Sequence, residues 1–234
     1  MNLHKLFLTK NNCYKAGKKI TVKGIMVHST GANNPTLKRY LPDDGLIGKN
    51  QYGNHWDTPL PDGREVCVHG FIGKLKDGTV ASYQTLPWNH RGWHAGGSAN
   101  NTHIGFEICE DGLTDSTYFN AVYKEAVELC AYLCKEYGLT EKDIICHSEG
   151  AKKGIASNHG DVMHWFPKHG KSMDTFRADV KKLLNTTDDK SKEIAEYISK
   201  FQKAGIITEP SKWQKKAEAD TDIYWLLKKT SAKL

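Results

Sequence analysis

The stretch Val22-Lys23-Gly24-Ile25-Met26-Val27-His28 decides the fold of this chain, and Ser29-Thr30-Gly31 follows it directly. Its apolar run has the length of a buried strand, and His28 stands where that strand ends. A second short run, Ile144-Ile145-Cys146-His147, ends in a histidine in the same way. Two such strands in one sheet bring both imidazoles to the same edge, so we expect His28 and His147 to meet there.

A carboxylate follows the second histidine closely enough to join the pair. Asp161 ends the segment Asn158-His159-Gly160-Asp161 and comes 14 residues after His147 (161 − 147 = 14). Two histidines and a carboxylate with an open fourth position are typical ligands of a hydrolytic zinc site. The residues alone leave an alternative open, because 11 histidines make chance pairings easy and a lone histidine is usually an ordinary polar residue.

Periodicity along the chain predicts an α/β fold with a mixed central β-sheet flanked by helices. Apolar or alternating runs predict strands at about 4–9, 22–28, 66–72, 79–84, 102–109 and 143–147. Lys76-Asp77-Gly78 is typical of a hairpin turn between two of them. Residues 30–65 are rich in Gly, Pro, Asn and Asp and predict a long loop that carries part of a substrate groove.

The helical part of the pattern divides the chain in two. A helix is predicted over about Ser116–Tyr137, because its apolar positions follow a 3.6-residue period and Gly138 ends it. Another is predicted over about 172–184, and the polar residues 185–191 are typical of a linker. Beyond the linker we expect a small C-terminal all-helical segment. The predicted domains are therefore 1–185 and 190–234.

Composition excludes some classes of protein. No run approaches the roughly 20 apolar residues of a membrane span. A net charge of +6 fits a solvated surface or an anionic partner, but the lysines do not cluster with aromatic residues, so we expect no nucleic acid. The N-terminus lacks the pattern of a secretory signal, which predicts a protein made in the cytoplasm without a signal peptide. The six cysteines are then expected to be buried free thiols rather than a disulfide framework.

Glu107 lies in the middle of a predicted strand with an apolar face. Ile104, Phe106 and Ile108 point to one side of this strand, whereas Glu107 points to the other together with His103, Gly105 and Cys109. A carboxylate in such a place needs a partner, a solvated cleft or a shifted pKa. Glu107 therefore either forms a salt bridge with a lysine or arginine or acts as a general base beside a metal.

Two further segments offer groups that could contact a ligand. The loop from Trp88 to Gly97 combines tryptophan, histidine and glycine, which suits stacking on a sugar or peptide, although tryptophan packing alone would also explain it. His159, two residues before Asp161, could supply a donor to an oxyanion.

Five motifs in order resemble one family. Ile25-Met26-Val27-His28-Ser29-Thr30, Val68-His69-Gly70-Phe71-Ile72, Trp93-His94-Ala95-Gly96, Ile104-Gly105-Phe106-Glu107 and Cys146-His147-Ser148-Glu149 resemble the type-2 N-acetylmuramoyl-L-alanine amidases. These zinc hydrolases occur among phage endolysins and bacterial autolysins, and peptidoglycan recognition proteins share their fold. The resemblance covers about residues 20–180 and leaves the C-terminal segment outside it.

The resemblance implies a set of functional residues. Zinc would be held by His28, His147 and Asp161, and Glu107 would be catalytic. His159 stands where many members have a lysine, and it is the second expected catalytic residue. We expect substrate contacts at four further positions, which are Trp93, His94, His69 and Asn101.

The implied activity is hydrolysis of the amide between N-acetylmuramic acid and L-alanine in peptidoglycan, by a phage or prophage endolysin that acts at the cell wall after release. A non-catalytic peptidoglycan-binding module is the main alternative, and a zinc peptidase acting within the stem peptide is another. The segment 190–234 would dock on the first domain, form a homodimer through its helices or bind wall polymer.

Overall fold

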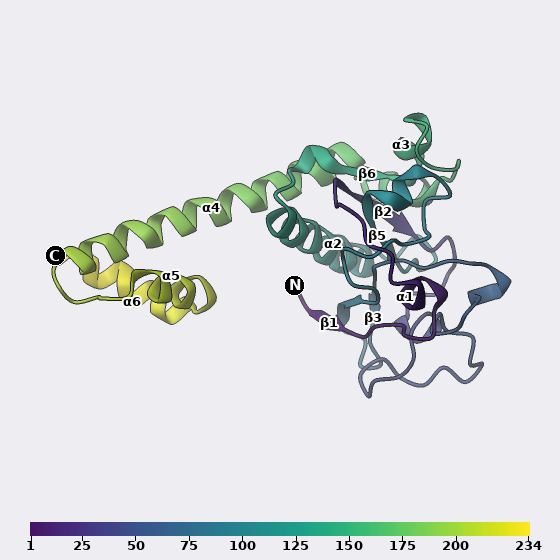
Figure 1. Ribbon diagram of the computed structural model, residues 1–234, viewed down its shortest axis with the longest axis horizontal. Coiled ribbons are helices and arrows are strands. Elements are labelled where there is room, and N and C mark those ends of the chain that lie inside the picture. Colours follow the sequence, from purple (N-terminus) through teal and green to yellow (C-terminus); the bar gives the residue numbers. More distant parts are fainter. The chain divides into compact units, whose positions relative to one another are not determined.

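A six-stranded mixed sheet organises the first part of the chain (Figure 1). The computed structural model describes residues 1–234, including every side chain except those of Asp62 and Thr187. The chain forms two compact units, Met1–Val180 and Lys181–Leu234. The predicted class, a mixed sheet flanked by helices with helices at the C-terminal end, is confirmed.

The strands lie close to their predicted positions. They are β1 (Leu3–Lys5), β2 (Gly24–Ser29), β3 (Gly70–Lys74), β4 (Val80–Gln84), β5 (His103–Ile108) and β6 (Ile144–Cys146). Their order in the sheet is β1-β4-β3-β5-β2-β6, and only β3 and β4 pair in antiparallel fashion. The turn between β3 and β4 is the predicted hairpin, in which Gly78 has φ +87° and the Asp77 side chain accepts the Thr79 N–H at 2.9 Å.

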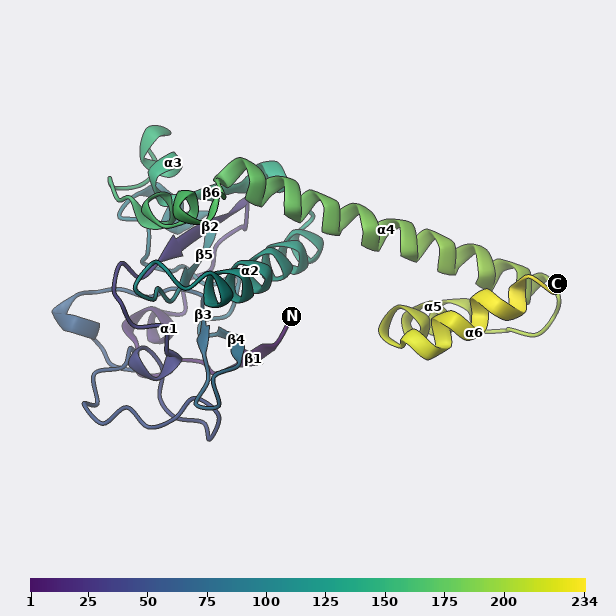
Figure 2. The ribbon, with the colours of Figure 1, turned by 180° about the vertical axis from the view of Figure 1, so that it is seen from behind.

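Helix α2 (Ser116–Tyr137) covers one face of the sheet (Figure 2). Its bounds are those predicted, with Asp115 accepting the Tyr118 N–H at 3.0 Å at the start and Gly138 at φ +64° after the end. The hydroxyl of Ser82 on β4 donates to Glu125 of α2 at 3.0 Å, so the even-numbered positions of β4 face this helix. The opposite face of the sheet is therefore left to the loops.

The long loop between β2 and β3 packs its apolar residues on that opposite face. It contains the 3₁₀ turns η1 (Leu37–Arg39) and η2 (Pro61–Gly63). Phe71 of β3 and Tyr83 of β4 lie in one buried cluster with loop residues that include Leu37, Leu41, Ile47 and Trp56. Strand pairing places Phe71 beside Glu107, and Glu107 beside His28. The loop-covered face is thus the face that carries the candidate functional residues.

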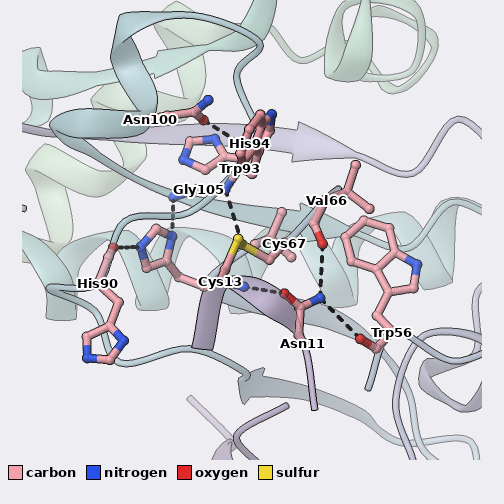
Figure 3. The surroundings of a disulfide bond; sticks show 12 residues. Asn11, Cys13, Trp56, Val66, Cys67, His90, Trp93, His94, Asn100 and Gly105 are labelled. Carbon is pink, nitrogen blue, oxygen red and sulfur yellow. Dashed lines mark hydrogen bonds between the residues drawn. A yellow bond between two sulfur atoms is a disulfide. The ribbon is translucent and has the colours of Figure 1, made fainter. Parts of the chain in front are cut away.

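A disulfide joins the N-terminal segment to the approach to β3 (Figure 3). Cys13, on α1 (Asn12–Ala16), is bonded to Cys67 with the Cα atoms 6.4 Å apart. The prediction of free thiols was wrong for this pair and correct for the buried Cys109, Cys130, Cys134 and Cys146. Asn11 holds the two cysteines close together. Its side-chain N–H groups donate to the carbonyls of Trp56 and Val66 at 3.3 and 3.0 Å, and its side-chain oxygen accepts the Cys13 N–H at 2.9 Å.

Four short 3₁₀ turns lie in the connections between β4 and the end of the first unit. They are η3 (Ser98–Asn101), η4 (Glu141–Asp143), η5 (Asp161–His164) and η6 (Phe166–His169). Helix α3 (His147–Lys152) begins directly after β6, where the Glu149 carboxylate accepts the Cys146 N–H at 3.1 Å. The sequence did not predict this helix, and its first residue, His147, was expected to end a strand.

The second unit is helical, as predicted, but the prediction of a non-helical linker before it was wrong. Helix α4 (Met173–Lys203) runs through residues 185–191, because the segment contains neither glycine nor proline and its polar residues can face solvent. Helices α5 (Pro210–Ala219) and α6 (Thr221–Ser231) pack with the end of α4 around Ile194, Ile198, Phe201 and Leu227. Among the described residues no helix has both the length and the apolar character that crossing a membrane requires.

Candidate metal centre

His28, His147 and Asp161 converge at one point on the loop-covered face. Nδ1 of His28 lies 3.2 Å from Nδ1 of His147 and 3.4 Å from Oδ2 of Asp161, and Nδ1 of His147 lies 2.9 Å from the same oxygen. Ligand atoms about 2.0 Å from a tetrahedral zinc ion are separated by about 3.3 Å. The spacing of these three atoms therefore fits one face of a zinc coordination tetrahedron.

Neighbouring groups fix the protonation of both imidazoles. Nε2 of His94 lies 3.2 Å from the carbonyl oxygen of His103, which can only accept, so His94 carries its proton on Nε2 and accepts at Nδ1. Nε2 of His28, 3.0 Å from that Nδ1, is then the donor. Nδ1 of a neutral His28 is left with a lone pair directed at the meeting point.

His147 has an equivalent partner. The hydroxyl of Ser157 donates to the carbonyl oxygen of Ala95 at 3.3 Å, so it accepts from Nε2 of His147 at 3.1 Å. The two Nδ1 lone pairs and the Asp161 carboxylate thus face one another without a shared proton. Three acceptors at this distance repel unless a cation lies among them, and hydrogen bonds from the far ring nitrogens are typical of histidine metal ligands.

The electrostatics of His28 and Asp161 favour the protonation states that a metal needs. Burial lowers the pKa of His28, so its imidazole is neutral at pH 7. Burial opposes ionisation of the Asp161 carboxyl, but positive charge opposite it outweighs burial and holds its pKa below the usual range, and in the absence of a metal a proton held by His147 or His28 supplies that charge. Neutral histidine and ionised carboxylate are the forms that bind zinc.

Glu107 lies on the neighbouring strand at the same level as His28. It lines the cleft, and among the described residues its Oε2 atom is buried without a hydrogen-bond partner. Burial raises the pKa of Glu107 well above its usual value, and the carboxylates of Asp161 and Glu110 add to the increase. No salt bridge to Glu107 occurs within the described part of the chain, which leaves the alternative of a general base.

The ligand group opens into a cleft of about 900 Å³. Trp93 and His159 line it and are exposed, and the His159 ring lies 4.8 Å from that of His147. The walls are formed mainly by loop residues that include Thr30, Asn33, Asn34, Tyr40 and Arg64. The loop 30–65 therefore forms part of this cleft, and its contact with a substrate stays a prediction.

Of the other predicted substrate contacts, His94 lines the cleft, whereas His69 and Asn101 are not among the described residues that line it. His94 lies against His28, and its main-chain N–H is held by Asn100 at 2.9 Å. His69 is fully buried, donates to the carbonyl of His90 and accepts the Gly105 N–H, so a substrate contact is not available to it. Asn101 is exposed and accepts from Arg91 at 2.7 Å, outside the residues that line the cleft.

Sequence reasoning missed two supporting residues. Ser157 orients His147 and buried Asn100 holds the backbone of His94, yet neither stands in a motif that marks its role. Only the proximity of Asn100 to the Trp93-His94-Ala95-Gly96 motif pointed toward it, and the neighbouring Asn101 was selected instead.

Comparison with known proteins gives this arrangement a family. Residues 18–163 match the family model described as N-acetylmuramoyl-L-alanine amidase. A curated relative, the probable N-acetylmuramoyl-L-alanine amidase of Bacillus licheniformis, is 27% identical over an alignment of 160 residues, and the match covers 63% of this chain. The chain spans about two fifths of that relative's length, since the match covers 40% of it.

Solved structures share the fold. The Staphylococcus aureus hydrolase AmiA, solved in complex with its ligand, has a TM-score of 0.56 at 20% identity, covering 79% of this chain and 83% of its own. A mutant endolysin from Bacillus subtilis has a TM-score of 0.51 at 23% identity, covering 77% and 99%. The family model spans more than half of the chain, and the chain therefore belongs to the N-acetylmuramoyl-L-alanine amidase family.

Proposed function

We propose that this protein is a zinc-dependent amidase that hydrolyses the bond between N-acetylmuramic acid and L-alanine in peptidoglycan. The observation that carries the proposal is the meeting of two imidazole lone pairs and an ionised carboxylate in a cleft. Membership of the amidase family supports the substrate and the bond.

His28, His147 and Asp161 would hold the zinc ion. Bound by three protein ligands, zinc lowers the pKa of a water to about 7 and polarises the carbonyl that is attacked. Its affinity for these residues follows from their chemistry, because imidazole nitrogen and carboxylate oxygen are common zinc ligands.

Glu107 would move the proton. As a carboxylate it accepts a proton from the attacking water, and as a carboxylic acid it gives that proton to the leaving amine of L-alanine. A raised pKa suits both halves of this task, since the group must bind and release a proton near neutral pH. Glu107 lies on β5, and the pairing of β5 with β2 fixes the position of Glu107 relative to His28.

His159 and Trp93 would act on the substrate from the cleft walls. The exposed ring of His159, beside His147, can donate a hydrogen bond to the oxyanion that forms on the attacked carbonyl. The indole of Trp93 is 42% exposed and offers a flat apolar surface for a sugar ring or a peptide.

The experiment that tests this proposal is lysis of purified cell walls. The expected result is a fall in turbidity that stops with a zinc chelator and returns with added Zn²⁺, and mass spectrometry should find intact stem peptides freed from glycan. Binding without lysis would indicate the recognition module instead. Cleaved stem peptides would indicate the peptidase.

The site of action outside the cytoplasm follows from the substrate. Disulfides are typical of proteins that work in oxidising surroundings, so the Cys13–Cys67 bond supports action at the cell wall. Release as a phage endolysin, and a homodimer through the C-terminal helices, remain predictions. Lysis of whole cells by protein added from outside tests the first prediction, and sedimentation of the full chain tests the second.

A further inference from the structure

The three candidate ligands differ in how they are supported. His28 donates to His94, and His147 donates to Ser157, so each imidazole is oriented by a direct partner. The Asp161 carboxylate faces the two histidines themselves, with Oδ2 3.4 Å from Nδ1 of His28 and 2.9 Å from Nδ1 of His147. Asp161 must therefore be positioned through its backbone.

That backbone is unusual. Asp161 has φ +44°, in the left-handed region that residues other than glycine rarely occupy. It begins the one-turn 3₁₀ helix η5, which main-chain hydrogen bonds hold together, from the Met163 N–H to the Gly160 carbonyl and from the Trp165 N–H to the Val162 carbonyl, both at 3.1 Å. His164 ends the same turn, so whatever fixes His164 also fixes the direction in which the turn faces. A residue in a sparsely occupied conformation persists only where its surroundings hold it.

Glu110 supplies the fixed point. Nε2 of His164 lies 2.9 Å from Oε2 of Glu110, whose other oxygen accepts the Gly31 N–H at 3.1 Å. The main-chain N–H of Glu110 donates to the Thr30 hydroxyl at 3.0 Å. Glu110 is 2% exposed, and it follows β5 just as Thr30 and Gly31 follow β2. One buried carboxylate thus ties η5 to the ends of the neighbouring strands β5 and β2, which also carry Glu107 and His28.

We propose that Glu110 and His164 form a positioning pair that holds Asp161 in place as the third zinc ligand. The proposal rests on the zinc site proposed above and deepens it. His164 lines the cleft, but its part is exerted through η5 rather than by contact with the metal. Partners of this kind around a metal site typically change metal affinity 10–100-fold when removed.

The test is the zinc affinity of the full-length metal-free protein, measured by competition with a chromogenic chelator. His164→Ala should weaken binding about 10–100-fold. His164→Gln keeps an N–H donor and should recover most of the loss. Glu110→Gln should also weaken binding, and combining it with His164→Ala should add little, because the two residues act as one unit.

Met163→Ala is the matched control. Met163 lies in the same turn and is 40% exposed, close to the 42% of the His164 side chain, so its removal disturbs η5 without touching the pair. Its zinc affinity should equal that of the wild type. The thermal stability of each metal-free variant, measured alongside, separates general loosening of the fold from loss of the ligand position.

Each outcome bears on the proposal. If the wild type binds zinc and His164→Ala binds it equally well, the positioning pair is wrong while the zinc site stands. If Met163→Ala weakens binding as much as His164→Ala does, the effect belongs to the turn in general and the pair is again wrong. A wild type that binds no zinc overturns the zinc site and this inference together.

Discussion

At the scale of single residues, Glu107 shows how a strand can bury a carboxylate without a partner for one of its oxygens. Strand pairing places it beside His28, and the loop-covered face keeps water from one of its oxygens. The alternation of the sequence predicted which way it points. The alternation could not predict that no basic side chain would meet it, because that depends on residues far away in sequence.

Glu107→Gln tests its part in proton transfer. The change keeps the shape and removes the base, so we expect kcat on cell walls to fall about 10²–10⁴-fold. Zinc affinity should stay within a few-fold of wild type, because Glu107 is not a predicted ligand. Wall lysis and chelator competition measure the two. Full activity of this variant would exclude Glu107 as the base.

Gly105 is a residue whose absent side chain matters. A Cβ atom at this position would collide with the ring of His94, which orients His28. We therefore expect Gly105→Ala to turn His94 away and to weaken zinc binding about 10-fold or more. Gly112→Ala is the control, because the nearest atom to its added Cβ is 3.6 Å away. Equal zinc affinities in the two variants would contradict this role of His94.

At the scale of elements, sequence periodicity predicted what local forces determine. The strands and α2 follow from apolar spacing and from caps such as Asp115 and Gly138. The linker at 185–191 was wrong because polar composition does not distinguish an exposed helix from a loop when glycine and proline are absent. The meeting of His28 and His147 was predictable because their strands end at the same edge of the sheet, and Asp161 follows His147 closely in sequence. Ser157 and Glu110 reach the site only through tertiary packing.

The disulfide was the largest element-scale omission, since a separation of 54 residues carries no local signal. Closing a loop of this length stabilises the fold by about 4 kcal/mol in the chain-entropy model. We expect the Cys13→Ser/Cys67→Ser variant to lose about this much unfolding free energy in urea. Reduced wild type should match the variant. If reduction left the free energy of unfolding unchanged, the bond would not form in solution.

At the scale of the whole molecule, the two units are stabilised differently. Residues 1–180 form a sheet-based unit with the candidate metal ligands and the disulfide, whereas residues 181–234 form a small helical unit around a few apolar side chains. In the second unit Glu193 contacts three groups. Its carboxylate accepts hydrogen bonds from the Tyr224 hydroxyl at 2.7 Å and from the Tyr197 hydroxyl, and it forms an ion pair with Lys228 at 2.9 Å.

These contacts make the second unit sensitive to acid. The hydrogen bonds from Tyr197, Lys228 and Tyr224 lower the pKa of Glu193 from 4.5 to about 2. A carboxylate whose pKa is lowered by folding contributes stability that is fully present above about 4.5 and is lost as the pH falls toward about 2. We expect Glu193→Gln to destabilise the second unit at pH 7 and to make little difference at pH 2.

Carboxyl-carbon NMR titration of the full chain measures the pKa of Glu193 directly. Glu196, which is exposed on the same helix, is the reference carboxylate for comparison. Salt should move the Glu193 midpoint upward, because the ion pair with Lys228 is open to solvent and is screened. A Glu193 midpoint near 4.5 at low salt would show that the carboxylate does not hold α4 and α6 together. The Glu193→Gln effect at pH 7 would then have to vanish as well.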